Sequence, residues 1–482
     1  MNKKIFSGAA TVRILKCLCT AWLALWYSAV FAQVKLPALI SDGMVLQQRS
    51  EVTLWGWAAP GEKISISAGW LKSPVHVTAG KNGQWKVQLA TAAAGGPYTL
   101  DFKASNNIEV KNVLLGEVWL CSGQSNMQFT LGKGPSNWET GVFNADEEIA
   151  KANYPEIREF TVKQNVADTL KTDVGGEWQT CVPQNARMFS AVAYYYAREI
   201  FKKTGFPVGL INSTWGGTPA ESWMRKEVLQ ADPDLSVILA RYQHNLETYP
   251  QDIAAYPARF KQWQKDTAAA HLNNQRPLKA PGRPANPATN SKSPCKLYNA
   301  MIAPLTPYTI KGVIWYQGES NAGRAYQYRK LFPALIKSWR NDRHNNHLPF
   351  YFVQISPHYT QNAEIREAQL LTWQTVPHTG MAVTIDNGDS ANVHPRNKEL
   401  VGKRLALWPL SHDYGYKHLV YSGPVYRSMK TDGDSIRLFF NYTDGGLKAK
   451  GSELTEFTVA GADHVFHTAQ AKIEGNTIVV SS

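Results

Sequence analysis

Six short segments in the middle of the chain are predominantly apolar along their whole length, and helical periodicity separates them. They are VLLGEVWLC (113–121), IREFTV (157–162), PVGLINS (207–213), GVIWY (312–316), PFYFVQI (349–355) and GMAVTID (380–386). Such runs suit strands of a parallel sheet covered on both faces. Ser190 to Lys203 and Tyr328 to Trp339 have the amphipathic pattern of covering helices. The pattern predicts a doubly wound α/β domain.

Shorter β-type segments flank this domain. From Val34 to about Val110, period-two apolar runs alternate with turn signals such as Pro60-Gly61, and β signals return from His412. We therefore expect two small β domains around the α/β domain. The predicted ranges are 33–111 for a β-sandwich-like domain, 112–225 and 296–411 for the α/β domain, and 412–482 for a β-rich domain.

Residues 226–295 interrupt the α/β pattern. The first part is helical and charged, and the second is the Pro-, Lys- and Asn-rich stretch RPLKAPGRPANPATNSKSP. This composition fits an insertion or lid over one edge of the sheet, or a disordered surface segment. We favour a partly ordered insertion, to which the sequence assigns no role.

The first 32 residues have the features of a secretory signal peptide. Four basic residues and no acidic residue precede an apolar run from Cys17 to Ala32. The run is shorter than the ~20 residues that span a bilayer, so we favour cleavage after Ala32 over an uncleaved anchor. The mature protein is then expected in the periplasm or outside the cell, without membrane attachment.

Net charge and cysteine content argue against a nucleic-acid partner, more than one disulfide and a metal site. Removing the leader lowers the formal net charge from +13 to +9, but Lys and Arg are scattered, so no nucleic-acid partner is expected. Cys121, Cys181 and Cys295 remain and allow at most one disulfide within the monomer. No cysteine or histidine spacing predicts a metal site, and no cofactor is expected.

The segment GEVWLCSGQSNMQF, from Gly116 to Phe129, breaks from an apolar strand into a polar corner. A serine directly after a strand and a glycine can stand on a sharp turn with its hydroxyl exposed, as a nucleophile requires. Ser and Asn are also ordinary capping and turn residues. We predict that Ser125 is a nucleophile because similar corners occur elsewhere.

Two further strands end in polar corners. GVIWYQGESN runs from Gly312 to Asn321, and DNGDSANVHPRNK runs from Asp386 to Lys398. Ligands of doubly wound sheets bind at the carboxyl ends of the strands. These corners are therefore expected to form one site with Ser125.

These motifs carry a resemblance to a known family. GQSNM, NSTWGGTPAESW (212–223), LYNAMIAP (297–304), YQGESN and VHPRNK resemble the sialate O-acetylesterase family of SGNH-type carbohydrate esterases, from about Leu36 to the C-terminus. The resemblance implies an SGNH-hydrolase fold and hydrolysis of O-acetyl esters on carbohydrates, with O-acetylated sialic acids as substrates. It also implies a further strand and tail beyond Ser482, so either the sequence is truncated or this branch of the family ends early.

His394 is the predicted general base. It follows a strand and precedes Pro395, which suits the first turn of a helix. SGNH enzymes commonly carry an aspartate two or three residues before the histidine, where this chain has Ala391 and Asn392. Asp389 is the preferred partner for the imidazole and Asp386 the alternative, and a Ser-His dyad held by a backbone carbonyl is the third possibility.

The oxyanion donors are expected at three corners. They are the backbone N–H of Ser125, a backbone N–H of Gly217 or Gly216, and a side-chain amide that the family resemblance places at Gln317 or Asn321, with Gln317 preferred. Glu319 is interpreted as an acceptor that holds its loop rather than as a second catalytic acid. The residues expected to line the substrate site are Gln124, Asn126, Trp215 and Glu319.

The sequence thus predicts a serine esterase that forms an acetyl-enzyme on Ser125. Acetylated xylan or another decorated glycan is the alternative substrate. A glycan-binding protein on an inactive hydrolase scaffold is the alternative from another class, and the missing near-neighbour aspartate favours it. A serine peptidase is the weakest interpretation, because acyl-transfer chemistry alone does not choose between ester and amide.

Overall fold

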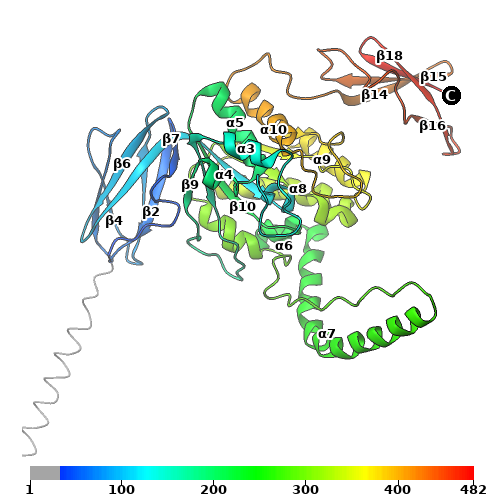
Figure 1. Ribbon diagram of the computed structural model, residues 1–482. Helices are drawn as coiled ribbons and strands as arrows, with labels where there is room; N and C mark the ends of the chain where they lie inside the picture. The colour runs from blue at the N-terminus through cyan, green and yellow to red at the C-terminus, as the bar shows by residue number, and fades with distance from the viewer. Residues whose placement is uncertain (1–32) are drawn as a thin grey trace, which may run out of the picture.

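The computed structural model describes residues 33–482. The predicted signal peptide and its cleavage after Ala32 lie outside the described residues. Figure 1 shows an N-terminal β domain beside a central α/β body, a helical projection from that body, and a C-terminal β domain reached by an extended segment. Between residues 33 and 482, no helix is long and apolar enough to cross a membrane.

The central sheet confirms the predicted doubly wound α/β fold. Its strand order is β13-β12-β11-β7-β10-β8-β9, and every neighbouring pair is parallel except β8 and β9. The order reverses direction at β7, whose neighbours are β11 and β10. The strands are β7 (Asn107–Gly123), β8 (Tyr154–Thr161), β9 (Trp178–Cys181), β10 (Val208–Thr214), β11 (Gly312–Tyr316), β12 (Phe350–Val353) and β13 (Thr379–Ala382). Ligands of such sheets bind where the strand order reverses, beyond the strands' carboxyl ends.

Helices cover both faces of this sheet. Trp119 of β7 packs edge-on against Tyr196 of α5 (Ala191–Thr204), and Trp315 of β11 packs against Phe332 and Trp339 of α8 (Ala325–Asp342). Gly312 is in register with Trp119, and Trp315 lies three positions further on. Because side chains alternate along a strand, the two tryptophans face opposite sides. α10 (Lys398–His412) packs beside α5, and α9 (Ala363–Thr375) packs beside α8.

The N-terminal β domain shares a strand with the central sheet. The first part of β7 pairs antiparallel with β6 (Gly95–Lys103), and its last part pairs with β10 and β11. The strand therefore runs without a break through the predicted boundary between residues 111 and 112. The other strands here are β1 (Val45–Gln47), β2 (Glu51–Trp57), β3 (Lys63–Ala68), β4 (Val75–Thr78) and β5 (Gln84–Ala90).

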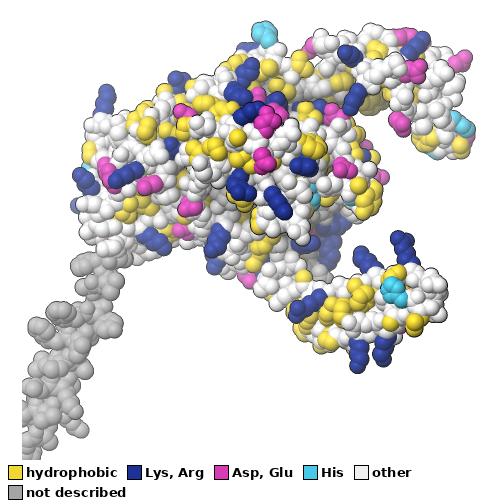
Figure 2. Space-filling model, in the orientation of Figure 1, with side chains coloured by type: hydrophobic (Ala, Val, Ile, Leu, Met, Phe, Trp, Pro, Cys, Tyr) yellow, Lys and Arg dark blue, Asp and Glu magenta, His cyan; other side chains and the backbone are white. Residues whose placement is uncertain are grey.

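The 226–295 segment contains two helices followed by a long irregular stretch of chain. α6 (Lys226–Ala231) is followed by α7 (Pro233–Leu272), which is 40 residues long and contains Pro250 and Pro257. Figure 1 shows α7 projecting from the central body and bending. The chain then returns beside the helix, where Trp263 Nε1 donates to the Leu278 carbonyl. Lys and Arg side chains stand on the face of this projection seen in Figure 2.

The C-terminal domain is a four-stranded antiparallel sheet with an additional strand pair. The sheet order is β14-β15-β19-β18, and β16 pairs with β17. Although the β signals return from His412, regular strand pairing begins only at Val425. The strands are β14 (Val425–Asp432), β15 (Ser435–Asn441), β16 (Thr458–Ala460), β17 (Phe466–Thr468), β18 (Gln470–Glu474) and β19 (Thr477–Ser481).

The three cysteines of the described residues are all buried and unpaired: Cys121, Cys181 and Cys295. Burial raises the pKa of each thiol. The thiols are therefore held in the unreactive protonated form. The single disulfide that three cysteines allow is not formed.

Candidate active site

Ser125 begins the short helix α2 (Ser125–Gln128) directly after β7. The turn between them depends on Gly123, which has φ +135° and lies so close to β11 that a Cβ would stand 2.2 Å from the Tyr316 carbonyl oxygen. The next residue, Gln124, donates its N–H to the same carbonyl at 3.0 Å. The end of β11 thus fixes the turn that carries the predicted nucleophile.

His394 lies against this turn. Its Nε2 is 2.8 Å from the Oγ of Ser125, within hydrogen-bonding distance. The expectation that a helix begins at Pro395 is wrong, because α10 begins at Lys398 and Asn397 caps it through Oδ1 to the Leu400 N–H. His394 therefore stands on the loop after β13 rather than at the mouth of the helix.

Neither predicted acid contacts the imidazole. Asp389 is exposed, and its Oδ1 accepts the N–H groups of Ala391 and Asn392, which closes the loop turn. Asp386 forms a two-pronged ion pair with Arg404, at 2.6 and 2.8 Å, which lowers the pKa of the carboxyl. The prediction that one of them orients the imidazole therefore does not hold.

The Nδ1 atom of His394 has no hydrogen-bond partner among residues 33–482. The backbone N–H of His394 donates to Asn392 Oδ1 at 2.9 Å, which fixes the main chain but not the ring. Within the described chain the pair is thus a Ser-His dyad, but without the backbone carbonyl that was expected to hold the imidazole in that arrangement.

The indole of Trp138 holds the imidazole in place. The two rings are stacked, with centroids 4.7 Å apart and planes inclined by 29°. Burial, together with the positive charges of Lys398 and His358, lowers the pKa of His394 to about 4. The imidazole is therefore neutral at physiological pH and able to accept a proton.

A buried amide connects the nucleophile turn to the histidine loop. Asn126 donates through Nδ2 to the Val393 carbonyl at 3.0 Å and to Glu319 Oε1 at 2.6 Å. Its Oδ1 accepts from Lys398 Nζ. Both amide hydrogens are used, so the prediction that Asn126 contacts substrate does not hold. Asn126 instead fixes the peptide that precedes the histidine.

Lys398 and Glu319 lie on the two sides of that amide. Burial lowers the pKa of Lys398 to about 7, against the opposing effect of Glu319, and burial raises the pKa of Glu319. The ammonium lies over the rings of Phe129 and Tyr316, at 4.8 and 5.4 Å from their centroids. Glu319 accepts from Asn126 and so has the loop-holding role that the sequence indicated.

The two candidate side-chain amides point into the core. Gln317 is fully buried, donates through Nε2 to the Thr218 carbonyl and to Asn321 Oδ1, and accepts from the Tyr328 hydroxyl. Asn321 is also buried and donates to Glu221 Oε2 at 2.9 Å. Gln317 has no amide hydrogen left, so the prediction that it donates to an oxyanion does not hold.

Backbone N–H groups are the other predicted oxyanion donors. The N–H of Gly216 is used by Gln128 Oε1 at 2.7 Å, whereas the N–H groups of Ser125 and Gly217 have no acceptor among the described residues. Gly216 lies so close to the nucleophile that a Cβ there would be 3.3 Å from the Cβ of Ser125. The Ser125 and Gly217 donors thus belong to corners that meet at the nucleophile.

Two other predicted site residues line this region. Gln124 uses Oε1 to accept the Ser320 N–H, and its Nε2 has no partner within residues 33–482. Trp215 is half-buried against the core, next to the Gly216 turn. Of the two, Gln124 keeps a free donor beside Ser125.

Sequence reasoning missed Trp138 and Lys398. Trp138 lies in a loop outside every motif, among 16 tryptophans, and gave no signal. The position of Lys398 was a signal, because a cation in the first turn of a helix interacts unfavourably with the helix dipole. Such a residue is expected to have a stabilising contact elsewhere. Among the described residues no three His, Cys, Asp or Glu side chains are grouped to hold a metal ion.

A family model described as carbohydrate esterase, sialic acid-specific acetylesterase, matches residues 287–408. The matched stretch includes the strand-end corners of Gln317 and His394 and the buried Lys398, whereas Ser125 lies before it. The corner of Gly216 and Gly217 also lies before the matched stretch, so two of the site's four strand-end corners fall within the matched residues.

Curated relatives are similar over most of the chain. The sialate O-acetylesterase of Rattus norvegicus is 32% identical over 434 residues, covering 81% of this chain and 76% of the relative. That of Homo sapiens is 30% identical over 442 residues, covering 81% and 73%. The crystal structure of a carbohydrate acetylesterase from Xanthomonas citri is 34% identical, with a TM-score of 0.75, and covers 93% of this chain and 91% of that one.

Proposed function

The chain belongs to the sialate O-acetylesterase family of carbohydrate esterases, as its motifs indicated, and we propose that it removes O-acetyl groups from sialic acids through an acetyl-enzyme on Ser125. The observation that carries this mechanism is the 2.8 Å distance between Ser125 Oγ and His394 Nε2. A binding protein needs no such pair, whereas nucleophilic catalysis does.

Acylation begins with a neutral imidazole. His394 Nε2 takes the Ser125 proton as Oγ attacks the acetyl carbonyl carbon, and the N–H groups of Ser125 and Gly217 stabilise the oxyanion. The imidazolium returns the proton to the sugar oxygen, which leaves as a free hydroxyl. A water molecule, deprotonated by the same nitrogen, then releases acetate and regenerates Ser125.

Because no carboxylate contacts the imidazole within residues 33–482, other residues must orient the ring. An aspartate normally orients the imidazole and stabilises its cation. Here the Trp138 ring fixes the plane of the imidazole and presents a π face that favours the cation. The Asn126 bond to Val393 fixes the peptide behind it. These contacts support catalysis by a dyad.

The choice of sialic acid rests on the names of the relatives, and acetylated xylan is the comparison substrate. The export signal predicted in residues 1–32 would place the enzyme where extracellular glycans are found.

The test is acetate release from a mono-O-acetylated sialic acid and from acetylated xylan. The mature protein is compared with Ser125→Ala and with Ser452→Ala, a matched change at an exposed serine. We expect the parent and Ser452→Ala to release acetate faster from the sialic acid and Ser125→Ala to lose at least about 10⁴-fold in kcat. Equal release by Ser125→Ala would exclude the serine mechanism, and faster release from xylan would exclude the substrate.

A further inference from the structure

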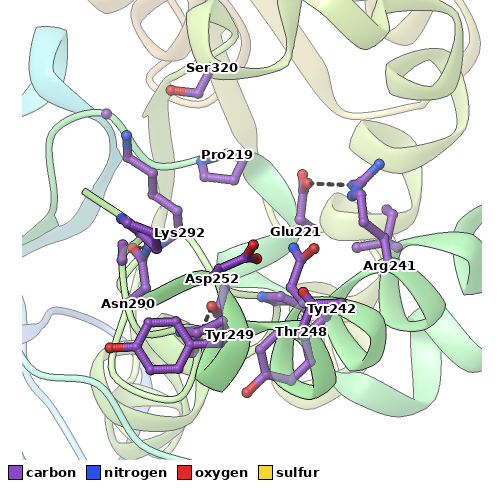
Figure 3. Close-up of a pocket in the computed structure, with 18 of the residues that line it drawn as sticks. Pro219, Glu221, Arg241, Tyr242, Thr248, Tyr249, Asp252, Asn290, Lys292 and Ser320 are labelled. Atoms are coloured by element: carbon purple, nitrogen blue, oxygen red, sulfur yellow. Dashed lines mark hydrogen bonds and ion pairs between the residues drawn. The ribbon is translucent and has the colours of Figure 1, made fainter. Parts of the chain in front are cut away.

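A cavity of about 700 Å³ lies between the 226–295 insertion and the corners of the candidate active site. Figure 3 shows Lys292 and Asn290 on one side of this pocket, Glu221 and Arg241 on the other, and Ser320 at one end. The walls come from α7, from the chain that returns after it, and from the Gly217 and Ser320 corners. The insertion thus encloses space that the α/β domain alone leaves open.

The pocket adjoins the nucleophile. Gly217, whose N–H is a proposed oxyanion donor, lines it, and a Cβ built there would stand 3.9 Å from Lys292 Nζ. Ser320 also lines it and donates its N–H to Gln124, the neighbour of Ser125. A sugar whose acetyl group reaches Ser125 would therefore extend into this cavity.

Two arginines share one buried carboxylate in the pocket. Glu221 is buried, its Oε1 lies 2.6 Å from Arg324 Nη1 and 3.6 Å from Arg241 Nη2, and its Oε2 accepts from Asn321. A guanidinium has five N–H donors, so each arginine keeps most of them. The side chain of Arg241 is 47% exposed, so its free donors can reach a ligand.

The charges lining the cavity favour an anion. Three cations, Arg241, Arg324 and Lys292, face two acids, Glu221 and Asp252. Lys292 Nζ has no hydrogen-bond or ion-pair partner among the described residues. Burial, and then the neighbouring Arg324 charge, lower the pKa of Arg241 against the opposing effect of Glu221. A bound carboxylate would add negative charge beside Arg241.

We propose, on the basis of the proposed function, that this pocket binds the acidic sugar of the substrate and that Arg241 and Lys292 bind its carboxylate. From opposite sides of the pocket, Arg241 provides donors that match a carboxylate, and Lys292 provides a flexible point charge beside Gly217. The tyrosine rings of Tyr242 and Tyr249 offer an amphipathic wall for the sugar. The insertion is then the part of the chain that selects acidic over neutral acetylated sugars.

The experiment compares a mono-O-acetylated sialic acid with its carboxamide, in which only the negative charge is lost. Acetate release is measured for the mature protein, Arg241→Gln, Lys292→Gln and the matched control Lys265→Gln, which removes an exposed charge from the same helix, α7, but does not line the pocket. We expect the parent and the control to prefer the acid by about tenfold or more in kcat/KM, mainly through KM. Each pocket variant should lose most of that preference.

The outcomes separate this inference from the proposed function. Release that requires Ser125 but is equally fast for acid and carboxamide, or a preference that survives both pocket substitutions, would overturn the carboxylate subsite and leave the esterase mechanism intact. Release of acetate that does not depend on Ser125 would instead overturn the proposed mechanism. A preference lost in Arg241→Gln and Lys292→Gln but kept in Lys265→Gln supports the subsite.

Discussion

The indole of Trp138 lies face to face with the imidazole of His394, with ring centroids 4.7 Å apart. The two residues come from a loop after α2 and a loop after β13. Because Nδ1 of the histidine has no partner among residues 33–482, this stacking is the contact of the described chain that defines the plane of the ring.

Replacing Trp138 with leucine should therefore lower kcat by about tenfold or more, with a smaller change in KM. Removing a stacked aromatic face costs about 1 kcal/mol and also lets the imidazole turn away from the serine. Steady-state kinetics with p-nitrophenyl acetate measure the effect, and Trp263→Leu on α7 is the matched control. An unchanged kcat in folded Trp138→Leu would contradict the role.

The substitution Asp389→Asn should change kcat by less than about threefold. The asparagine Oδ1 can still accept the N–H groups of Ala391 and Asn392, so the turn is kept. In a triad the same change costs about 10⁴-fold in kcat. A loss of that size would show that Asp389 reaches the imidazole during turnover.

The substitution Gln317→Leu should reduce stability more than activity. It removes the bonds to Thr218, Asn321 and Tyr328 in the core and leaves buried partners unsatisfied, at a cost of about 2–4 kcal/mol. Urea unfolding measures the loss. An oxyanion donor would show the opposite result, with unchanged stability and a loss of about 10²–10³ in kcat.

The pH dependence of kcat/KM should follow His394. Its pKa of about 4 keeps the imidazole neutral down to acidic pH, so kcat/KM for p-nitrophenyl acetate should stay level between about pH 8 and 5 and fall below about pH 4. Lys398→Met removes one positive charge beside the ring and should move the inflection upward. An inflection near 6.5 in the parent would mean that a negative group offsets the burial of His394.

Stability should also depend on pH through Lys398. Its folded pKa of about 7 lies below the unfolded value near 10.5, so between these values the unfolded chain binds more protons. The free energy of unfolding should therefore rise as pH increases from about 7 toward 10.5, and the rise should be smaller in Lys398→Met. Urea titrations at several pH values compare the two slopes.

Most of what could be predicted came from the apolar strand pattern and from the positions of the polar corners that follow the strands. Apolar runs predicted the parallel sheet, and the corners after β7 and β13 brought Ser125 and His394 together in space. The amphipathic pattern from Ser190 to Lys203 also predicted α5, which spans Ala191–Thr204. These features depend on local periodicity, which the chain displays directly.

The orientation of polar side chains could not be predicted in the same way. Gln317 and Asp389 both follow strands, yet one turns into the core and the other closes a loop turn. Position in the chain fixes which corner a residue occupies but not its rotamer or partners. Trp138 was missed for a related reason, because a stacking contact between two loops leaves no periodic pattern.

The continuity of β7 limits how this protein can be divided. The same 17-residue strand pairs with the N-terminal β domain at one end and carries the Ser125 turn at the other. There is no linker between the two parts that could act as a hinge or as a cleavage site for a protease. An expression fragment beginning at residue 112 would cut through a hydrogen-bonded strand and leave the first residues of the remaining part of β7 without their β6 partner. The N-terminal β domain is thus part of the minimal folding unit of the esterase, and exchanging it between relatives would require transplanting the strand as well.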